Sequence, residues 1–154
     1  MRTVRVQDEL FDQAHEIERL THGRTDIGAV VSFHGLCRSE QGQLSALELE
    51  HFPGMAEDEI ERVVAQAEAR WPLLGLCVIH RFGKIAAGEP IVLVITAAAH
   101  RQPAFEAADF LMDYLKTQAP FWKKQWSVSG QAGDWVEAQA GDDAQAERWQ
   151  TAPQ

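Results

Sequence analysis

An apolar run over 91–99 passes directly into an amphipathic stretch over 100–124, and this junction most limits how the chain can fold. The run reads IVLVITAAA, which is typical of a strand that is covered on both faces. Apolar residues then recur at three- and four-residue steps: Phe105, Ala108, Met112 and Leu115. That spacing predicts one face of a helix that begins near Pro103 and ends at Ala119, because the residue before Pro120 is disfavoured in the α region. A strand that runs into a helix through polar residues is a common site geometry.

Similar patterns predict further elements on both sides of this junction. Alternating or β-branched runs predict strands over 3–6, 28–35, 44–52 and 76–82, and apolar stripes predict helices over 8–20 and 55–71. A hairpin of 125–128 with 134–137 is expected across Ser129-Gly130. This mixture predicts an α+β fold, in which helices pack on a mixed or antiparallel sheet.

Residues 1–140 are expected to form a single domain. The chain has 154 residues, which is enough to bury one hydrophobic core, and it shows no internal repeat or domain linker. The segment 141–154 is rich in Ala, Gln and Asp, and Trp149 is its one large apolar residue. This segment is expected to be a C-terminal tail, either a loosely docked helix or partly disordered.

Several classes of function are disfavoured by what the sequence lacks. A formal net charge of −9 argues against general nucleic-acid binding, which needs a basic surface. No apolar run is long enough to span a bilayer and the first residues do not resemble a signal peptide, so a cytoplasmic protein without membrane contact is expected. Cys37 and Cys77 have no C-x-x-C spacing, and motifs for metal, nucleotide cofactor or serine-triad catalysis are missing. No metal and no cofactor are therefore expected.

Basic residues gather around the predicted helix of 100–124, although the chain as a whole is acidic. Six of them stand at the two ends of this helix and in a polar loop over 36–43: Arg38, His100, Arg101, Lys116, Lys123 and Lys124. Converging cations predict an anion pocket, because forked guanidinium donors bind phosphate well and Lys116, on the rim of an apolar face, is a candidate reactive amine. The alternative is that all six are solvated, since lysine near a helix C-terminus is also stable in water. The residues alone name no substrate, and a small phosphometabolite-binding protein would fit them too.

Longer segments give the chain a family resemblance. They are GAVVSFHGLCR over 28–38, LELEHFPGMAE over 47–57, RWPL with VIHRFG over 70–83, AAAHRQPAFEAADFLMDYLKTQAPFWKK over 97–124, and DWVEA over 134–138. In this order they resemble the large, catalytic subunit of molybdopterin synthase, and they cover most of the chain. The resemblance implies an α/β-hammerhead-like fold.

The resemblance also implies an activity and an assembly. The family is a sulfurtransferase that forms the dithiolene of the molybdenum cofactor from cyclic pyranopterin monophosphate, or precursor Z. Sulfur comes from a small ubiquitin-like partner whose C-terminal Gly-Gly carries a thiocarboxylate. Two large subunits form a homodimer with one small subunit at each end, a heterotetramer. A non-catalytic module that binds the partner's tail or a small phosphorylated metabolite is the alternative.

Carried over position by position, the resemblance assigns roles to particular residues. Lys116 and Lys123 match the catalytic lysines. The substrate-binding positions, which include the pocket wall, are Phe33, Arg38, His100, Arg101, Met112 and Lys124. One departure is Gln139, because some relatives carry there an arginine that reaches the neighbouring subunit's pocket.

Overall fold

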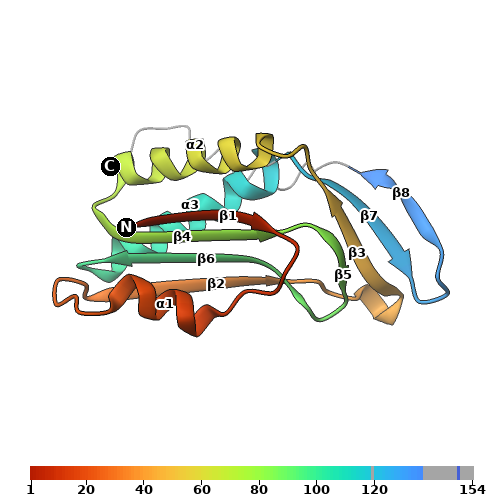
Figure 1. The fold of residues 1–154 in the computed structure, drawn as a ribbon, viewed down its shortest axis with the longest axis horizontal. Coiled ribbons are helices and arrows are strands. Elements are labelled where there is room, and N and C mark those ends of the chain that lie inside the picture. Colours follow the sequence, from red (N-terminus) through yellow and green to blue (C-terminus); the bar gives the residue numbers. More distant parts are fainter. Residues whose placement is uncertain (119, 137–148, 150–154) are drawn as a thin grey trace.

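The computed structural model describes residues 1–118, 120–136 and 149, and it is built around a four-stranded mixed sheet (Figure 1). The strand order of this sheet, sheet A, is β1 (Arg2–Gln7), β4 (Leu73–Arg81), β6 (Pro90–Ala98) and β2 (Ala29–Leu36). Strand β1 pairs with β4 in parallel, whereas β6 is antiparallel to both β4 and β2. The predicted strands over 3–6, 28–35, 76–82 and 91–99 are thus confirmed, with small shifts at their ends.

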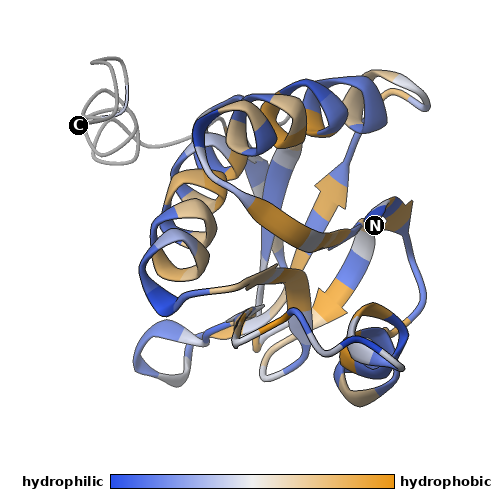
Figure 2. Ribbon diagram, turned by 90° about the vertical axis from the view of Figure 1, so that its left-hand side faces the viewer, coloured by the Kyte–Doolittle hydropathy of each residue, from blue (hydrophilic) through white to orange (hydrophobic). Residues whose placement is uncertain are grey.

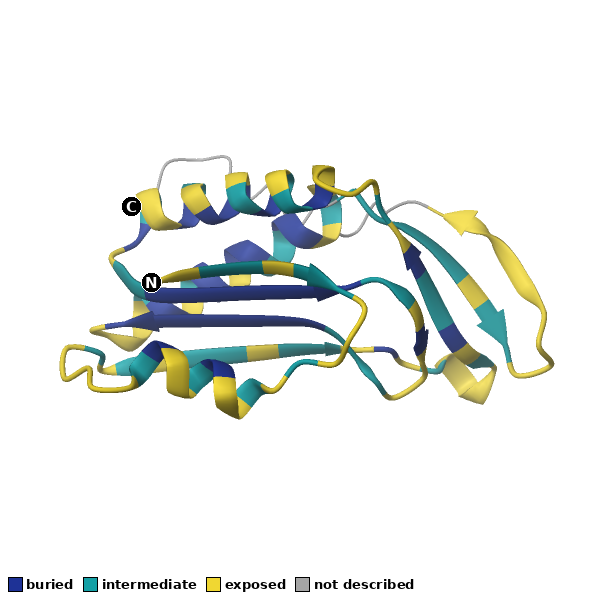
Figure 3. Ribbon diagram, in the orientation of Figure 1, coloured by how far each residue is buried: buried dark blue, intermediate teal, exposed yellow. Residues whose placement is uncertain are grey.

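Helices cover both faces of sheet A. Helices α2 (Met55–Arg70) and α3 (Arg101–Gln118) pack on one face, and α1 (Gln13–Thr21) packs on the other (Figure 2). The side chains of β4 and β6 therefore alternate between two cores, and Figure 3 shows both strands buried along most of their length. This double cover explains why their sequences are continuously apolar rather than alternating. The α+β prediction is confirmed.

A second sheet extends from one end of sheet A (Figure 1). Sheet B has the strand order β5 (Gly83–Ala86), β3 (Leu44–Glu50), β7 (Trp122–Ser127) and β8 (Ala132–Val136), and all of its pairs are antiparallel. A short 3₁₀ helix, η1 (Glu40–Gly42), precedes β3. One face of sheet B carries a small third core of Cys37, Leu49 and Ile85.

The structure corrects several predicted boundaries. The helix expected over 8–20 begins at Gln13, because the Asp12 side chain caps it by accepting a hydrogen bond from the His15 N–H at 3.1 Å. Strand β5 was not predicted, since it has four residues and begins at Gly83, whose φ of +86° marks a turn. The final hairpin is confirmed, but its first strand begins at Trp122 rather than at 125.

Only Trp149 is described within the predicted tail of 141–154. Its ring contacts Trp71 and Phe110 edge-on, with centroids 5.7 Å away in both cases, and its indole N–H donates to Asp113. Trp149 is therefore packed on the core between α2 and α3. The remaining tail residues, the expected domain boundary at 140 and Gln139 lie outside the described residues, so what the sequence predicts for them stays a prediction.

None of the helices in the described part of the chain is long and apolar enough to cross a bilayer.

Candidate active site

A cavity of about 840 Å³ opens where sheet A meets sheet B. Its floor is the end of sheet A where β2 and β4 finish and β6 begins. Gly35 of β2, His80 of β4 and Val92 of β6 line the cavity there. The last turns of α3 form one wall, and the inner face of sheet B forms another. Residues far apart in the sequence are thus brought to one place.

Helix α3 brings Lys116 to this cavity because the chain reverses between β6 and α3. The helix runs back over sheet A, so its C-terminal end returns to the point where β6 begins. Buried residues such as Leu111 and Leu115 fix its rotation, and Met112 and Lys116 stand at the edge of that buried face. Both Met112 and Lys116 line the cavity, and the catalytic role that the resemblance gives to Lys116 stays a prediction.

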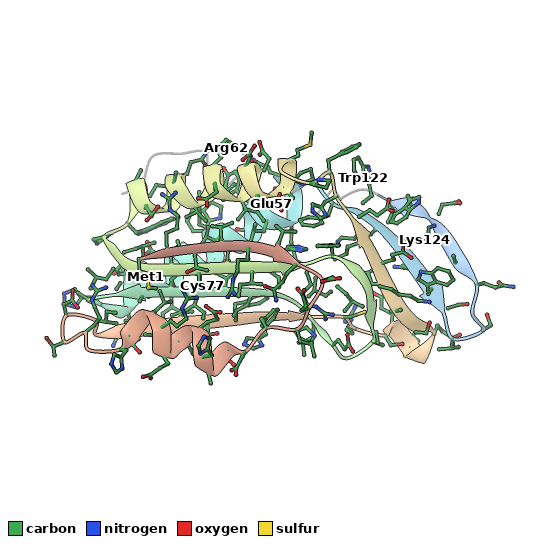
Figure 4. All side chains as sticks on the ribbon, viewed as in Figure 1. Met1, Glu57, Arg62, Cys77, Trp122 and Lys124 are labelled. Carbon is green, nitrogen blue, oxygen red and sulfur yellow. The ribbon has the colours of Figure 1, made fainter. Side chains whose placement is uncertain are left out.

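Strand β7 supplies Lys123, and the alternation of the strand separates it from Lys124. Lys123 pairs with Leu49 of β3 and lines the cavity on the inner face of sheet B. Lys124 points to the opposite face, because successive side chains of a strand alternate. Its ammonium lies 4.3 Å from the ring centroid of Trp135, out over β7 and β8 in Figure 4. Lys124 does not line the cavity, and its predicted contact with substrate has no geometric support.

The end of β2 supplies two more predicted residues. Phe33, on β2, is 40% exposed, and its ring borders the cavity. Arg38 follows the strand in the loop and makes an ion pair with Glu40 at 2.8 Å, with both side chains largely exposed. Such an exposed pair exchanges partners readily. An incoming anion can therefore recruit the Arg38 guanidinium.

His100 and Arg101 stand at the other end of α3. They lie fifteen or more residues before Lys116, which in a helix of 1.5 Å rise corresponds to roughly 22 Å. Both are exposed, and neither lines the cavity. The expectation that cations from both ends of the helix share one pocket is therefore not met within a single chain.

The structure also reveals an aromatic wall that the sequence reading missed. The rings of His80 and Phe121 are stacked, with centroids 4.0 Å apart and planes inclined by 13°. Both residues line the cavity. Burial lowers the pKa of His80 to about 4, and its ring is therefore uncharged at neutral pH. A single histidine in an apolar strand matches no sequence motif. Its position one residue before the end of the strand could nevertheless have indicated a site residue.

A second hollow of about 670 Å³ lies beneath the β7–β8 hairpin and the loop that follows β2. Arg38, Glu40 and Lys123 line both cavities. The two hollows are therefore neighbours across these three charged side chains. Together they give room for a ligand larger than a single phosphate.

The chemistry available here is that of amines, a guanidinium and apolar walls. Among the described residues, no group of three or more His, Cys, Asp or Glu side chains could hold a metal ion. Burial raises the pKa of the Cys37 thiol, and burial together with the neighbouring Glu16 raises that of Cys77 to about 12. Both thiols are protonated at neutral pH and are therefore poor sulfur nucleophiles. The site can bind an anion, stabilise charge on oxygen and move protons through lysine.

Known proteins resemble this chain over nearly its whole length. The family model described as MoaE protein matches residues 6–118. The chain is 65% identical to the molybdopterin synthase catalytic subunit of Mesorhizobium japonicum, over 97% of this chain and 94% of that relative. The structure of the molybdopterin biosynthesis MoaE protein from Burkholderia ambifaria matches with a TM-score of 0.83 and 41% identity, over 98% of this chain and 99% of that one.

A more distant likeness concerns the fold alone. The complex of subunits 1 and 2 of molybdopterin-converting factor from Helicobacter pylori matches with a TM-score of 0.69 at 17% identity. The match covers 89% of this chain and 90% of that chain.

Proposed function

Because the chain belongs to the MoaE family, we propose that it acts as the catalytic subunit of a molybdopterin synthase. In this reaction sulfur passes from the thiocarboxylated C-terminus of a small ubiquitin-like partner to cyclic pyranopterin monophosphate, and the dithiolene of molybdopterin is formed. The observation that carries the proposal is that Lys116 and Lys123, from α3 and β7, border one cavity in a chain so similar to known catalytic subunits.

The sulfur must come from outside this chain. Its two cysteines are buried and protonated, so neither can serve as a sulfur carrier at neutral pH. A partner that brings its own thiocarboxylate removes this need. Each transfer leaves an ordinary carboxylate on the terminal glycine of the partner, with the replacing oxygen supplied by water, and two transfers complete one dithiolene.

The cavity offers a role for each residue that lines it. Lys116 and Lys123 would stabilise negative charge on the carbonyl oxygen of the tail and exchange protons with the substrate. Arg38, released from Glu40, would bind the phosphate. Phe33 and Met112 would form the apolar wall against the pterin or the glycine tail. No metal and no cofactor is assigned to these steps.

His100 and Arg101 can join this site only from another copy of the chain. Within one chain they stand roughly 22 Å along α3 from Lys116. A homodimer of large subunits, with one small subunit at each end, would let α3 of one copy present these cations to the substrate of the other. We place this assembly in the cytoplasm, where a thiocarboxylate donor and a phosphorylated pterin would be available.

The proposal is tested by reconstitution. The purified protein is mixed with the thiocarboxylated partner and precursor Z, and dithiolene product is measured for wild type and Lys116→Ala. Wild type should form product, and folded Lys116→Ala should lose about 10²- to 10⁴-fold in rate, as is typical when a proton-transferring group is removed. Product at equal rates from both would exclude Lys116 from the chemistry. No product from wild type, with tail binding intact, would favour the non-catalytic binding module.

A further inference from the structure

Lys123 follows closely on Phe121, an aromatic residue whose ring contacts two histidines. The rings of Phe121 and His80 are stacked with centroids 4.0 Å apart, and the ring centroid of His51 lies 5.6 Å from that of Phe121, with the two planes inclined by 38°. We call His80, Phe121 and His51 the histidine–phenylalanine stack. His51 is itself anchored, with its ring 4.6 Å from Phe82 and its side chain only 8% exposed. The stack therefore joins the start of β7 to the ends of β3 and β4.

The stack fixes the chain where it leaves α3. Lys116 lies in the last turn of that helix and Lys123 lies in β7, so only six residues of the chain separate the two lysines. Phe121 is the ring in this connection that packs against the small core of sheet B. A shift of Phe121 would carry the first residues of β7 with it. The separation of the two catalytic amines consequently depends on how firmly Phe121 is held.

His80 is suited to hold Phe121 without disturbing Lys123. Its Nδ1 lies 2.8 Å from the Arg81 carbonyl oxygen, which can only accept, so Nδ1 carries the proton. That hydrogen bond fixes the plane of the ring. Burial keeps the ring uncharged at neutral pH, with the charges of Lys123 and His51 acting in the same direction. A charged ring here would repel the Lys123 ammonium.

We propose that His80 is a positioning residue for Lys123, and that it acts by stacking on Phe121 rather than by touching the substrate. The inference rests on the proposed function, because it concerns the placement of a catalytic amine in sulfur transfer. It adds a residue on β4 to a site otherwise built from β2, α3 and β7. It also predicts that an aromatic ring of similar size can replace the histidine.

The test is a double-mutant cycle on kcat, with the thiocarboxylated partner and precursor Z as substrates. His80→Leu and Phe121→Leu each remove one side of the stack while they retain apolar volume. Each should lower kcat about 10- to 100-fold, because small misplacements of reacting groups have effects of this size, and should leave KM for the partner within about twofold. The double variant should be no slower than either single variant. His80→Phe should restore kcat to within about threefold of wild type.

A control separates positioning from general loss of stability. Phe110→Leu removes a fully buried ring from the main core, and Phe110 does not line the cavity. It should lower the melting temperature yet leave kcat of the folded protein near the wild-type value. Wild type without any activity would overturn the proposed function itself.

Other outcomes would overturn the positioning role alone. An active wild type with an equally active His80→Leu variant would do so. Multiplicative losses in the double variant, or a folded His80→Phe as slow as His80→Leu, would do so too. If His80→Leu does not fold, the comparison of His80→Phe with Phe121→Leu decides the question.

Discussion

Two adjacent lysines of β7 face opposite sides of sheet B, and this gives a matched pair of substitutions. Lys123→Ala removes an amine that lines the cavity, whereas Lys124→Ala removes one that lies over Trp135. We expect Lys123→Ala to lower kcat/KM by at least about 10²-fold. Lys124→Ala should change it less than about threefold, because an exposed cation–π contact contributes only about 0.5–1 kcal/mol, and to folding rather than to catalysis. Steady-state assays of both variants, side by side, measure the difference.

The opposite ranking would be informative. A larger loss for Lys124→Ala would mean that the substrate extends over the outer face of sheet B, as the sequence-based assignment of Lys124 implies. Circular dichroism should first establish that both variants are folded.

His80 also links stability to pH. Its pKa is about 4 in the folded protein and near 6.5 when the chain is unfolded, so the unfolded state binds the additional proton between these values. The free energy of unfolding must therefore fall as pH drops from 6.5 to 4, by roughly 3 kcal/mol in total. Above pH 6.5 His80 is neutral in both states, and none of this stability is lost. His80→Phe should show a smaller loss of unfolding free energy over the same range. Urea titrations at pH 7, 5.5 and 4.5 measure it.

A matched variant separates the effect of His80 from that of the carboxylates, which bind protons over the same pH range. His22 has a side chain that is 82% exposed, so His22→Phe serves as the exposed-histidine control with which the curve of His80→Phe is compared. Identical curves for wild type and His80→Phe would show that His80 is not the group responsible.

At the scale of elements, helix α1 is held to sheet A through a buried carboxylate. The Glu16 side chain is 5% exposed and accepts hydrogen bonds from Arg5 of β1 and from Arg19. The Cys77 thiol donates to it at 3.8 Å. Glu16→Ala should lower the free energy of unfolding by about 1–3 kcal/mol. We expect a value in the lower part of this range, because the guanidinium groups of Arg5 and Arg19 can be hydrated once the carboxylate is removed. Chemical denaturation measures the loss.

The same helix offers a control. Glu18 pairs with His22 at 3.0 Å, but both side chains are mostly exposed. Glu18→Ala should therefore change stability by less than about 0.5 kcal/mol. Equal effects of the two substitutions would mean that Glu16 does not anchor α1.

Sequence patterns predicted most elements but not all of the site. Strands β4 and β6 were evident because burial on both faces demands continuous apolar sequence. Strand β5 was too short to leave a pattern, and its partners are set by tertiary pairing with β3. His80 was missed because its role depends on a ring forty-one residues later in the chain. The separation of Arg101 from Lys116, by contrast, follows from helix rise and could have been calculated from the sequence.

At the scale of the whole molecule, the distance between the two ends of α3 predicts complementation between copies. If Arg101 serves the site of a second copy, Arg101→Ala and Lys116→Ala damage different chains. A mixed dimer then keeps one intact site, with wild-type Lys116 from one chain and wild-type Arg101 from the other. Random mixing of two inactive variants by co-expression should restore about a quarter of wild-type activity, because half of the dimers are mixed and each has one working site.

The restored activity must be compared with that of control mixtures of two other variants. Mixing Lys116→Ala with Lys123→Ala should restore no activity, because both lysines line the cavity of their own chain and each site of the mixed dimer then lacks one of them. Mixing Arg38→Ala with Lys116→Ala should also restore no activity, because these two residues line the same cavity within one chain. A further experiment places Lys116→Ala and Arg101→Ala together in one chain and mixes this double variant with wild-type chains. If activity there follows the number of wild-type chains alone, Arg101 acts within its own subunit.

The placement of the tryptophans gives this protein an internal optical reporter. Trp122 borders the cavity, where it meets Phe52 edge-on at 5.4 Å, and Figure 4 shows it near the start of α2. Trp71 and Trp149 emit from the core between α2 and α3, away from that opening. A tail that enters the cavity should therefore alter the emission of Trp122 while the core pair stays constant. Stopped-flow fluorescence could follow partner docking in real time without any dye attached to the protein.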